Sequence, residues 1–202
     1  IIMSIVTLNN RALKDATAVG SITGLGDLVF ISRSTASSSA SVSITSGIDS
    51  TYKEYIFVFN NIHPATNNAH FTFQGSTDGG SGYGVNITSS AFSTEHNEAD
   101  SSTDLSYQTS VDLAQSTGYQ RITSSNENDN DNGASGFLHL FNPSDTTFVK
   151  HFIITGNTVA AAYTVGTHIA GYFNTTSAIN AINFKMSSGN IDSGTIDLYG
   201  VN

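Results

Sequence analysis

Hydrophobic and polar residues alternate along most of this chain in short runs. The run Glu54–Asn60 places Tyr55, Phe57 and Phe59 on one side, and Gly194–Gly200 alternates in the same way near the end of the chain. A period of two predicts half-buried strands, and many short strands in succession predict a sandwich or barrel. We therefore expect an all-β fold, an antiparallel jelly-roll-like β-sandwich.

Turn-forming residues separate the expected strands. An Asp-Gly pair at 78–79 favours a tight hairpin that joins Ala69–Gln74 to Tyr83–Thr88. The polar insertions that we expect to form exposed loops are residues 75–82, 94–104 and 124–135. The remaining expected strands are Leu28–Arg33, Ser41–Thr45, Glu54–Asn60, Leu105–Leu113, Tyr119–Thr123, Gly136–Asn142, Phe148–Thr155, His168–Phe173, Ala181–Met186 and Thr195–Tyr199.

The first 27 residues lack this alternation. Gly20, Gly24 and Gly26 interrupt any helix that begins near Leu8. A segment this short and rich in glycine is not expected to form a core of its own. We predict an N-terminal arm over residues 1–27 and a β-sandwich domain over residues 28–202. The arm either lies on its own domain or anchors the chain to a neighbouring subunit.

Composition restricts the partners of the chain. Its 202 residues carry a formal net charge of −9, and the 7 basic residues are scattered. Nucleic-acid binding requires clustered Lys and Arg, and an anionic membrane would repel this chain, so we expect neither nucleic-acid binding nor membrane insertion. The chain contains no cysteine, so disulfides and thiolate chemistry are excluded. Its first residues lack the pattern of a signal peptide.

The run Asn126–Gly133 is the candidate metal site. Glu127, Asp129 and Asp131 alternate with amide side chains there, and carboxylate and amide oxygens are ligands that calcium prefers. The run departs from the EF-hand pattern, because His139 stands where a bidentate Glu is expected. Asn, Asp and Gly also form ordinary solvated loops. Both interpretations stay open, and no other cofactor is indicated.

Three tyrosines are candidates for glycan contact. Tyr83, Tyr107 and Tyr119 each combine a flat apolar ring with a hydroxyl, which suits a sugar. The alternative is that they pack on their own sheet. His139 and His151 stand among apolar residues in predicted strands, so we expect them on the solvent face or against a neighbouring subunit.

No motif of an enzyme is present in the sequence. A Gly-x-Ser-x-Gly elbow and a phosphate-binding loop with its Lys are both missing. Carboxylate pairs for glycoside hydrolysis meet in space and cannot be read from the sequence. We therefore expect a protein that is not an enzyme.

Four segments carry a resemblance to a known group of proteins. They are Val6–Asn10, Asp49–Tyr55, Leu140–Ser144 and Gly194–Gly200. With them the chain resembles short virion structural proteins of tailed phages that infect marine cyanobacteria and other marine bacteria. The ending Leu-Tyr-Gly also resembles the C-terminal β-domains of phage fibre proteins. The resemblance implies a tail-fibre-like or capsid-decoration protein without catalytic residues.

These observations together predict a non-enzymatic virion protein on the particle surface. We expect a homo-oligomer, preferably a trimer, that attaches to other virion proteins through residues 4–27. The preferred role is a tail-fibre or adsorption appendage that contacts host-surface glycan; the alternative is capsid decoration. From another class, a carbohydrate-binding module or a polysaccharide-degrading enzyme stays open. The chain would be made in the host cytoplasm without a signal peptide.

Overall fold

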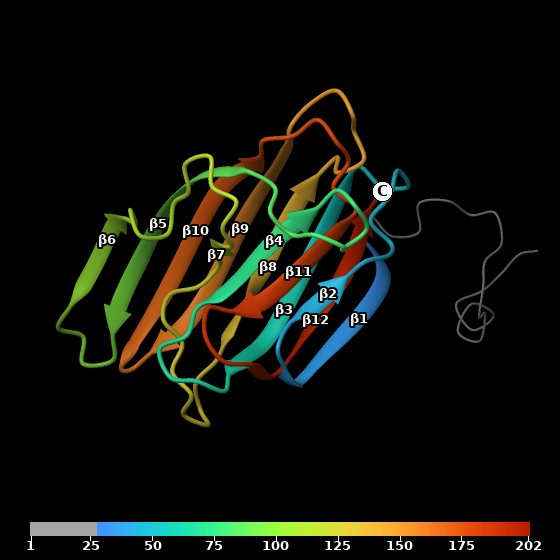
Figure 1. Ribbon diagram of the computed structural model, residues 1–202. Coiled ribbons are helices and arrows are strands. Elements are labelled where there is room, and N and C mark those ends of the chain that lie inside the picture. Colours follow the sequence, from blue (N-terminus) through green and yellow to red (C-terminus); the bar gives the residue numbers. More distant parts are fainter. Residues whose placement is uncertain (1–27) are drawn as a thin grey trace, which may run out of the picture.

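The computed structural model describes residues 28–202, which form two antiparallel sheets packed face to face (Figure 1). The prediction of an all-β antiparallel β-sandwich is confirmed. The predicted arm, residues 1–27, lies outside the described residues. Within residues 28–202, no helix has the length and apolar character needed to cross a bilayer.

The large sheet has eight strands in the order β1-β12-β3-β8-β9-β10-β5-β6. Every neighbouring pair in it is antiparallel. Its strands are β1 (Leu28–Ser39), β12 (Ile191–Val201), β3 (Glu54–Pro64), β8 (Ala134–Phe141), β9 (Lys150–Ala160), β10 (Tyr163–Phe173), β5 (Ile87–Asn97) and β6 (Thr103–Tyr107).

The small sheet has four strands in the order β2-β11-β4-β7. These strands are β2 (Val42–Ile44), β11 (Ala181–Met186), β4 (Phe71–Ser76) and β7 (Gln120–Arg121). In Figure 1 this sheet lies in front of the large sheet.

Strand pairing is nested from the ends of the described chain inward. The first strand pairs with the last, β2 with β11, β3 with β8, and β4 with β7. Successive pairs alternate between the large and the small sheet. Nested pairs that alternate between two sheets are a feature of jelly rolls. The jelly-roll assignment itself stays a prediction.

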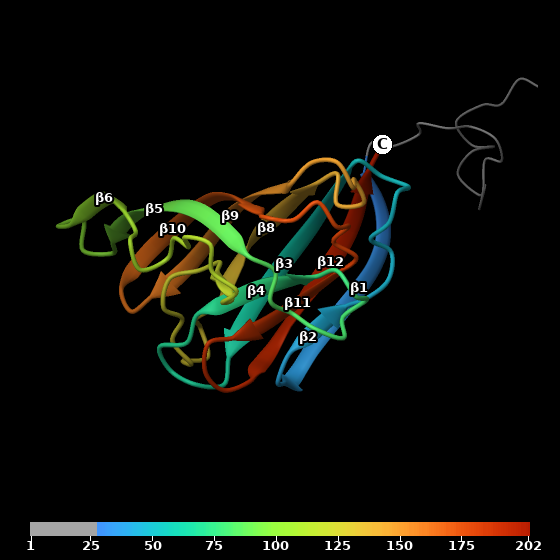
Figure 2. The same ribbon diagram turned by 45° about the horizontal axis from the view of Figure 1, so that its top comes forward.

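Four further strands widen the large sheet. β9, β10, β5 and β6 continue it beyond β8, and the small sheet has no strands to match them. Figure 2 shows β5 and β6 projecting past the small sheet at one side of the molecule. The wide sheet therefore presents more surface than its partner covers.

Aromatic rings fill the space between the sheets. Phe184 of β11 stacks on Phe71 of β4, with ring centroids 5.6 Å apart and an interplanar angle of 13°. It also contacts Phe57 and Phe59 of β3, at 5.6 Å and 6.4 Å. All four side chains are fully buried. The alternation that predicted β3 therefore points its aromatic residues into the core, as expected.

Three local predictions are wrong, and one of them is the strand Leu105–Leu113, because β6 ends at Tyr107 and a turn follows it. The segment at Asp78-Gly79 does not join a hairpin, because β4 pairs with β11 and β7, whereas β5 lies in the other sheet. Asp78 Oδ1 accepts hydrogen bonds from Ser76 Oγ (2.6 Å) and Gly82 N (2.9 Å), so the segment closes on itself as a polar turn. Residues 94–104 are not one exposed loop, since β5 and β6 pair across much of this stretch.

Candidate functional site

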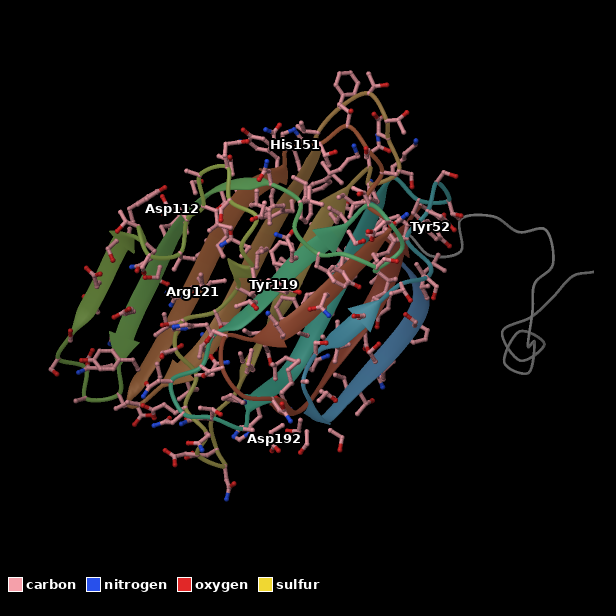
Figure 3. The ribbon with its side chains drawn as sticks, viewed as in Figure 1. Tyr52, Asp112, Tyr119, Arg121, His151 and Asp192 are labelled. Carbon is pink, nitrogen blue, oxygen red and sulfur yellow. The ribbon has the colours of Figure 1, made fainter. Side chains whose placement is uncertain are left out.

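A polar groove of about 560 Å³ opens at one end of the sandwich, near Asp192, which Figure 3 labels. Its walls come from β3, β8, β9, the start of β12 and the loop before β8. Amide, hydroxyl, carboxylate and imidazole groups dominate the lining, and we name it the amide groove. The lining residues used below are Asn61, His63, Asp131, Ser135, Asn157 and Asp192.

A β-bulge places Asn61 in this groove. The pairing of β3 with β8 shifts register between Phe59 and Ile62, and Asn61 has a φ of 49°. Asn adopts this left-handed conformation more readily than most residues with a side chain. Opposite it, Gly194 has a φ of 126°, and a Cβ there would lie 2.8 Å from the Asn61 carbonyl oxygen. The bulge therefore requires glycine at position 194.

His63 links the acidic loop to β12. Its Nε2 lies 3.1 Å from the carbonyl oxygen of Asp129, and its Nδ1 lies 3.5 Å from Oδ2 of Asp192. A carbonyl oxygen only accepts, so Nε2 is the donor to Asp129, and Nδ1 can donate to Asp192 only when the ring carries both protons. The hydrogen bond from Nε2 holds the acidic loop against β3, the strand that carries His63, and this part of the loop forms one wall of the groove.

Asn157 supplies the opposite wall. Its Nδ2 donates to Thr164 Oγ1 (2.8 Å) on the neighbouring strand, which orients the side chain. Ser135, its cross-strand partner, accepts a hydrogen bond from the Asn61 backbone N–H at 3.0 Å. The groove therefore offers oriented amide and hydroxyl groups beside the carboxylates of Asp131 and Asp192, an arrangement that can exchange hydrogen bonds with the hydroxyls of a polyol.

The acidic run 126–133 is divided by a turn. Asn132 N donates to the Asp129 carbonyl oxygen at 2.9 Å. Glu127 accepts a weak contact from Asn132 Nδ2 at 3.4 Å, whereas Asp131 lines the amide groove. Within residues 28–202, no three side chains of His, Cys, Asp or Glu gather as metal ligands. The structure therefore brings Asp131 together with Asp192, and it does not cluster Asp131 with Glu127 and Asp129.

The three candidate tyrosines do not form one platform. Tyr119 lies over the small sheet (Figure 3), where its hydroxyl donates to Asn183 Oδ1 (2.9 Å) and Lys185 Nζ lies 4.0 Å from its ring centroid. Burial, followed by the nearby charge of Tyr83, raises the pKa of its hydroxyl. Tyr107 lies on β6 of the large sheet and donates to Asp112 Oδ2 (2.8 Å).

Tyr83 has a different setting from the other two tyrosines. Its hydroxyl oxygen is buried and has no hydrogen-bond partner among the described residues. Its side chain lines a second pocket of about 520 Å³ together with Asn86 and Asn174. This pocket combines a ring with amide groups, so Tyr83 stays a candidate for glycan contact.

The two histidines for which we expected a solvent-facing position lie on the outer face of the large sheet. His139 pairs across strands with Ile56 and Ile153, and His151 pairs with Tyr172. Figure 3 labels His151 at the end of the sandwich opposite Asp192. The expectation of a solvent-facing position is confirmed for both residues within the described chain.

Sequence reasoning missed Asn61, Asn157 and Asp192. These residues lie far apart in the chain, and only the pairing of β3, β8, β9 and β12 brings them to one groove. One signal was present: the Asn60-Asn61 pair breaks the alternation of Phe57 and Phe59, as a bulge does.

Comparisons of the chain with protein-family models, with curated proteins and with solved structures found no match.

Proposed function

We propose that this chain is a non-enzymatic virion surface protein whose amide groove contacts host-surface glycan. The observation that carries the glycan part is the lining of the groove. Amide, hydroxyl and carboxylate groups from four strands and a loop converge there on a space of about 560 Å³. Neutral sugars present many hydroxyls, each a donor and an acceptor, and such a lining satisfies both.

Support for the virion part comes from topology and from the resemblance. Nested pairing between two sheets is a feature shared with jelly rolls, an architecture that occurs in viral capsid and lectin domains. One fold can host many functions, so this likeness supports only the class of virion surface proteins. The role of the chain within that class is argued from the amide groove. The strand Gly194–Gly200, which carries the resemblance to phage fibre domains, is the central part of β12. A tail appendage is preferred to capsid decoration.

A glycan array with the full-length chain tests the groove. Binding to a host-type polysaccharide is expected for the wild type, and Asn157→Ala should weaken it about tenfold, the effect of one well-oriented hydrogen bond. Asn86→Ala, in the second pocket, is the matched control and should bind as the wild type does. Equal binding by wild type and Asn157→Ala would contradict the assignment, and stronger loss in Asn86→Ala would move the site to the Tyr83 pocket.

Particle location requires a separate measurement. Gold-labelled antibody against the chain should mark the tail of purified particles. Label over the whole capsid would favour decoration instead, and failure to label particles would contradict a virion role.

A polysaccharide-degrading enzyme is the second candidate, and one observation favours it. Asp131 and Asp192 line the same groove, as the two carboxylates of a glycoside hydrolase do. Release of reducing ends by the wild type, lost in Asp192→Asn while binding persists, would establish this alternative. Binding without release of reducing ends would support the non-enzymatic proposal.

A further inference from the structure

The outer face of the large sheet, turned away from the small sheet, carries a continuous row of side chains. Cross-strand pairing aligns one residue from each of β3, β8, β9, β10, β5 and β6, and paired residues of an antiparallel sheet point to the same side. The residues of this row are Val58, Phe137, Thr155, His168, Phe92 and Tyr107. A second row, two positions along the strands, contains Ile56, His139, Ile153 and Ala170.

This face contains most of the exposed large hydrophobic side chains of residues 28–202. Leu105 is 69% exposed, Tyr107 55%, Ile153 47%, Phe92 45% and Phe137 39%. Surface hydrophobic residues scattered singly are ordinary, but a contiguous group on one sheet face marks an interaction surface. We name the outer side of β8, β9, β10, β5 and β6 the apolar face.

Few charged side chains lie in the two rows, although the chain carries −9, and the charged residues beside the rows are paired. Asp197 is paired with Arg33 by two hydrogen bonds of 2.7 Å and 2.6 Å. Glu54 contacts the ring of His139. The first row contains no Asp, Glu, Lys or Arg, and its one histidine is His168, so two copies can approach through this face without the repulsion that their net charge produces elsewhere.

The area of the apolar face suits an interface between proteins. The whole outer side of these five strands, including the part that adjoins the amide groove, covers about 700 Å², from five to eleven residues in each strand at about 3.3 Å by about 4.8 Å for each residue. A standard protein–protein interface buries about 800 Å² on each partner. A small sugar would cover a fraction of this area.

Ring orientation further disfavours a sugar here. The rings of Phe92 and His168 stack on each other, with centroids 4.9 Å apart and an angle of 21°. Each ring therefore covers a face of the other, and sugars stack on open ring faces. Extended apolar side chains such as Leu105 and Ile153 instead need the close packing that another protein surface supplies.

We infer that a second copy of this chain covers the apolar face, which is the self-association interface of the protein. The amide groove opens on the same outer side, at the edge of this face: Ser135 and Asn157 pair with each other two residues from the first row, in the cross-strand row that ends at Leu105. An interface centred on the first and second rows leaves the groove at its rim. The inference and the glycan proposal concern adjoining parts of one sheet side and are tested by separate measurements, so either can fail alone.

Single-cysteine labelling tests whether the face is covered. The native chain has no cysteine, so Ile153→Cys and Ser188→Cys each introduce one thiol. Position 188 lies in an exposed loop between β11 and β12 and serves as the matched control. In the full-length protein at about 100 μM, a maleimide should label Ile153→Cys at least about tenfold more slowly than Ser188→Cys, because an interface core excludes solvent. Equal labelling rates would overturn the inference.

Sedimentation velocity tests which molecule covers it. The wild type should sediment as an oligomer, and Ile153→Glu should raise its dissociation constant at least about a hundredfold, because a charge would be buried at the interface. Ser188→Glu adds the same charge elsewhere and should leave the oligomer intact. Ile153→Thr keeps a β-branched residue at an exposed position, so it should fold and also weaken association. A monomeric wild type, or an oligomer unaffected by Ile153→Glu, would overturn the inference.

Discussion

Phe184 is the position where the packing of the two sheets can be measured most directly. Its ring is fully buried and contacts Phe57, Phe59, Phe71 and Phe73, with centroids 5.6, 6.4, 5.6 and 6.4 Å away. These partners come from both sheets. Phe184→Ala therefore removes contacts between β11 and β4 in the small sheet, and it also removes contacts between β11 and β3 of the large sheet.

The expected loss of stability follows from burial and ring contacts. Replacing a buried Phe by Ala lowers the free energy of unfolding by about 3–5 kcal/mol through lost transfer energy and the cavity left behind. Aromatic pairs add about 0.5–1.5 kcal/mol each beyond their buried area. With four rings around it, Phe184→Ala should reach the upper end of the range, about 4–5 kcal/mol. Phe184→Leu keeps much of the volume and should cost about 1–2 kcal/mol.

Urea unfolding at fixed protein concentration, followed by far-ultraviolet circular dichroism, provides the measurement. The midpoint should fall in the order wild type, Phe184→Leu, Phe184→Ala, while the dependence on urea stays constant. Phe148→Ala is the control, because its ring is 70% exposed and should contribute less than about 0.5 kcal/mol. A loss below about 2 kcal/mol for Phe184→Ala would refute packing of the sheets through this ring.

Four other expectations follow from particular groups. Tyr83→Phe should raise the free energy of unfolding by about 1 kcal/mol in urea melts, since it removes a buried hydroxyl without a partner. Hydrogen bonds from Arg33 lower the pKa of Asp197 below its ordinary 3.8, so stability is full above about pH 4 and falls as the carboxylate is protonated in acid; Asp197→Asn should flatten this acid loss in urea midpoints between pH 7 and pH 2.5. Lys150→Met should lower stability by about 1–3 kcal/mol, because the buried ammonium donates to three carbonyl oxygens at 2.6, 3.2 and 3.3 Å. Calcium binding by residues 126–133 predicts a melting temperature raised by calcium and lowered by EDTA, and an unchanged value would remove that hypothesis.

Alternation was a sound guide to strands with one buried side. In β3, the residues Tyr55, Phe57 and Phe59 are buried, and Ile56 and Val58 between them are partly exposed. Aromatic residues alternate there with the aliphatic Ile56 and Val58, so the period of two is visible as a change in side-chain type although both sides are apolar. β4 is buried along its whole length, so its prediction depended on the turns at its ends.

The hairpin prediction failed because an Asp-Gly pair reports only local geometry. Asp78 forms a turn, but the strand that follows, β5, belongs to the other sheet. All eleven of its residues pair there with residues of β10. The long pairing stabilises β5 more than a short hairpin with β4 could. Local turn chemistry could not reveal this competition between distant strands.

The amide groove could not be predicted from the sequence either, because it also depends on the pairing of distant strands. Asn61 enters it through a bulge, and Asn157 and Asp192 enter through two other strands. Only Asp131 came from a segment that composition had singled out. Its neighbours Glu127 and Asp129 do not line the groove, and the run turns between 129 and 132. A cluster of like residues in sequence is thus weaker evidence for a site than strand pairing is.

The amide groove and the apolar face lie on the same two strands, so association through one affects binding through the other. β8 and β9 carry Ser135 and Asn157 in the groove, and two to four residues away on the same strands they carry Phe137 and Ile153 on the apolar face. Strands are rigid, so association through the face would hold the grooves of neighbouring copies at fixed separations. A solvated polar groove binds a sugar weakly, but several grooves on one assembly bind a repeating surface with a far higher effective concentration. Disrupting the face with Ile153→Glu would then weaken attachment to a polysaccharide surface while leaving the affinity for a single soluble sugar unchanged.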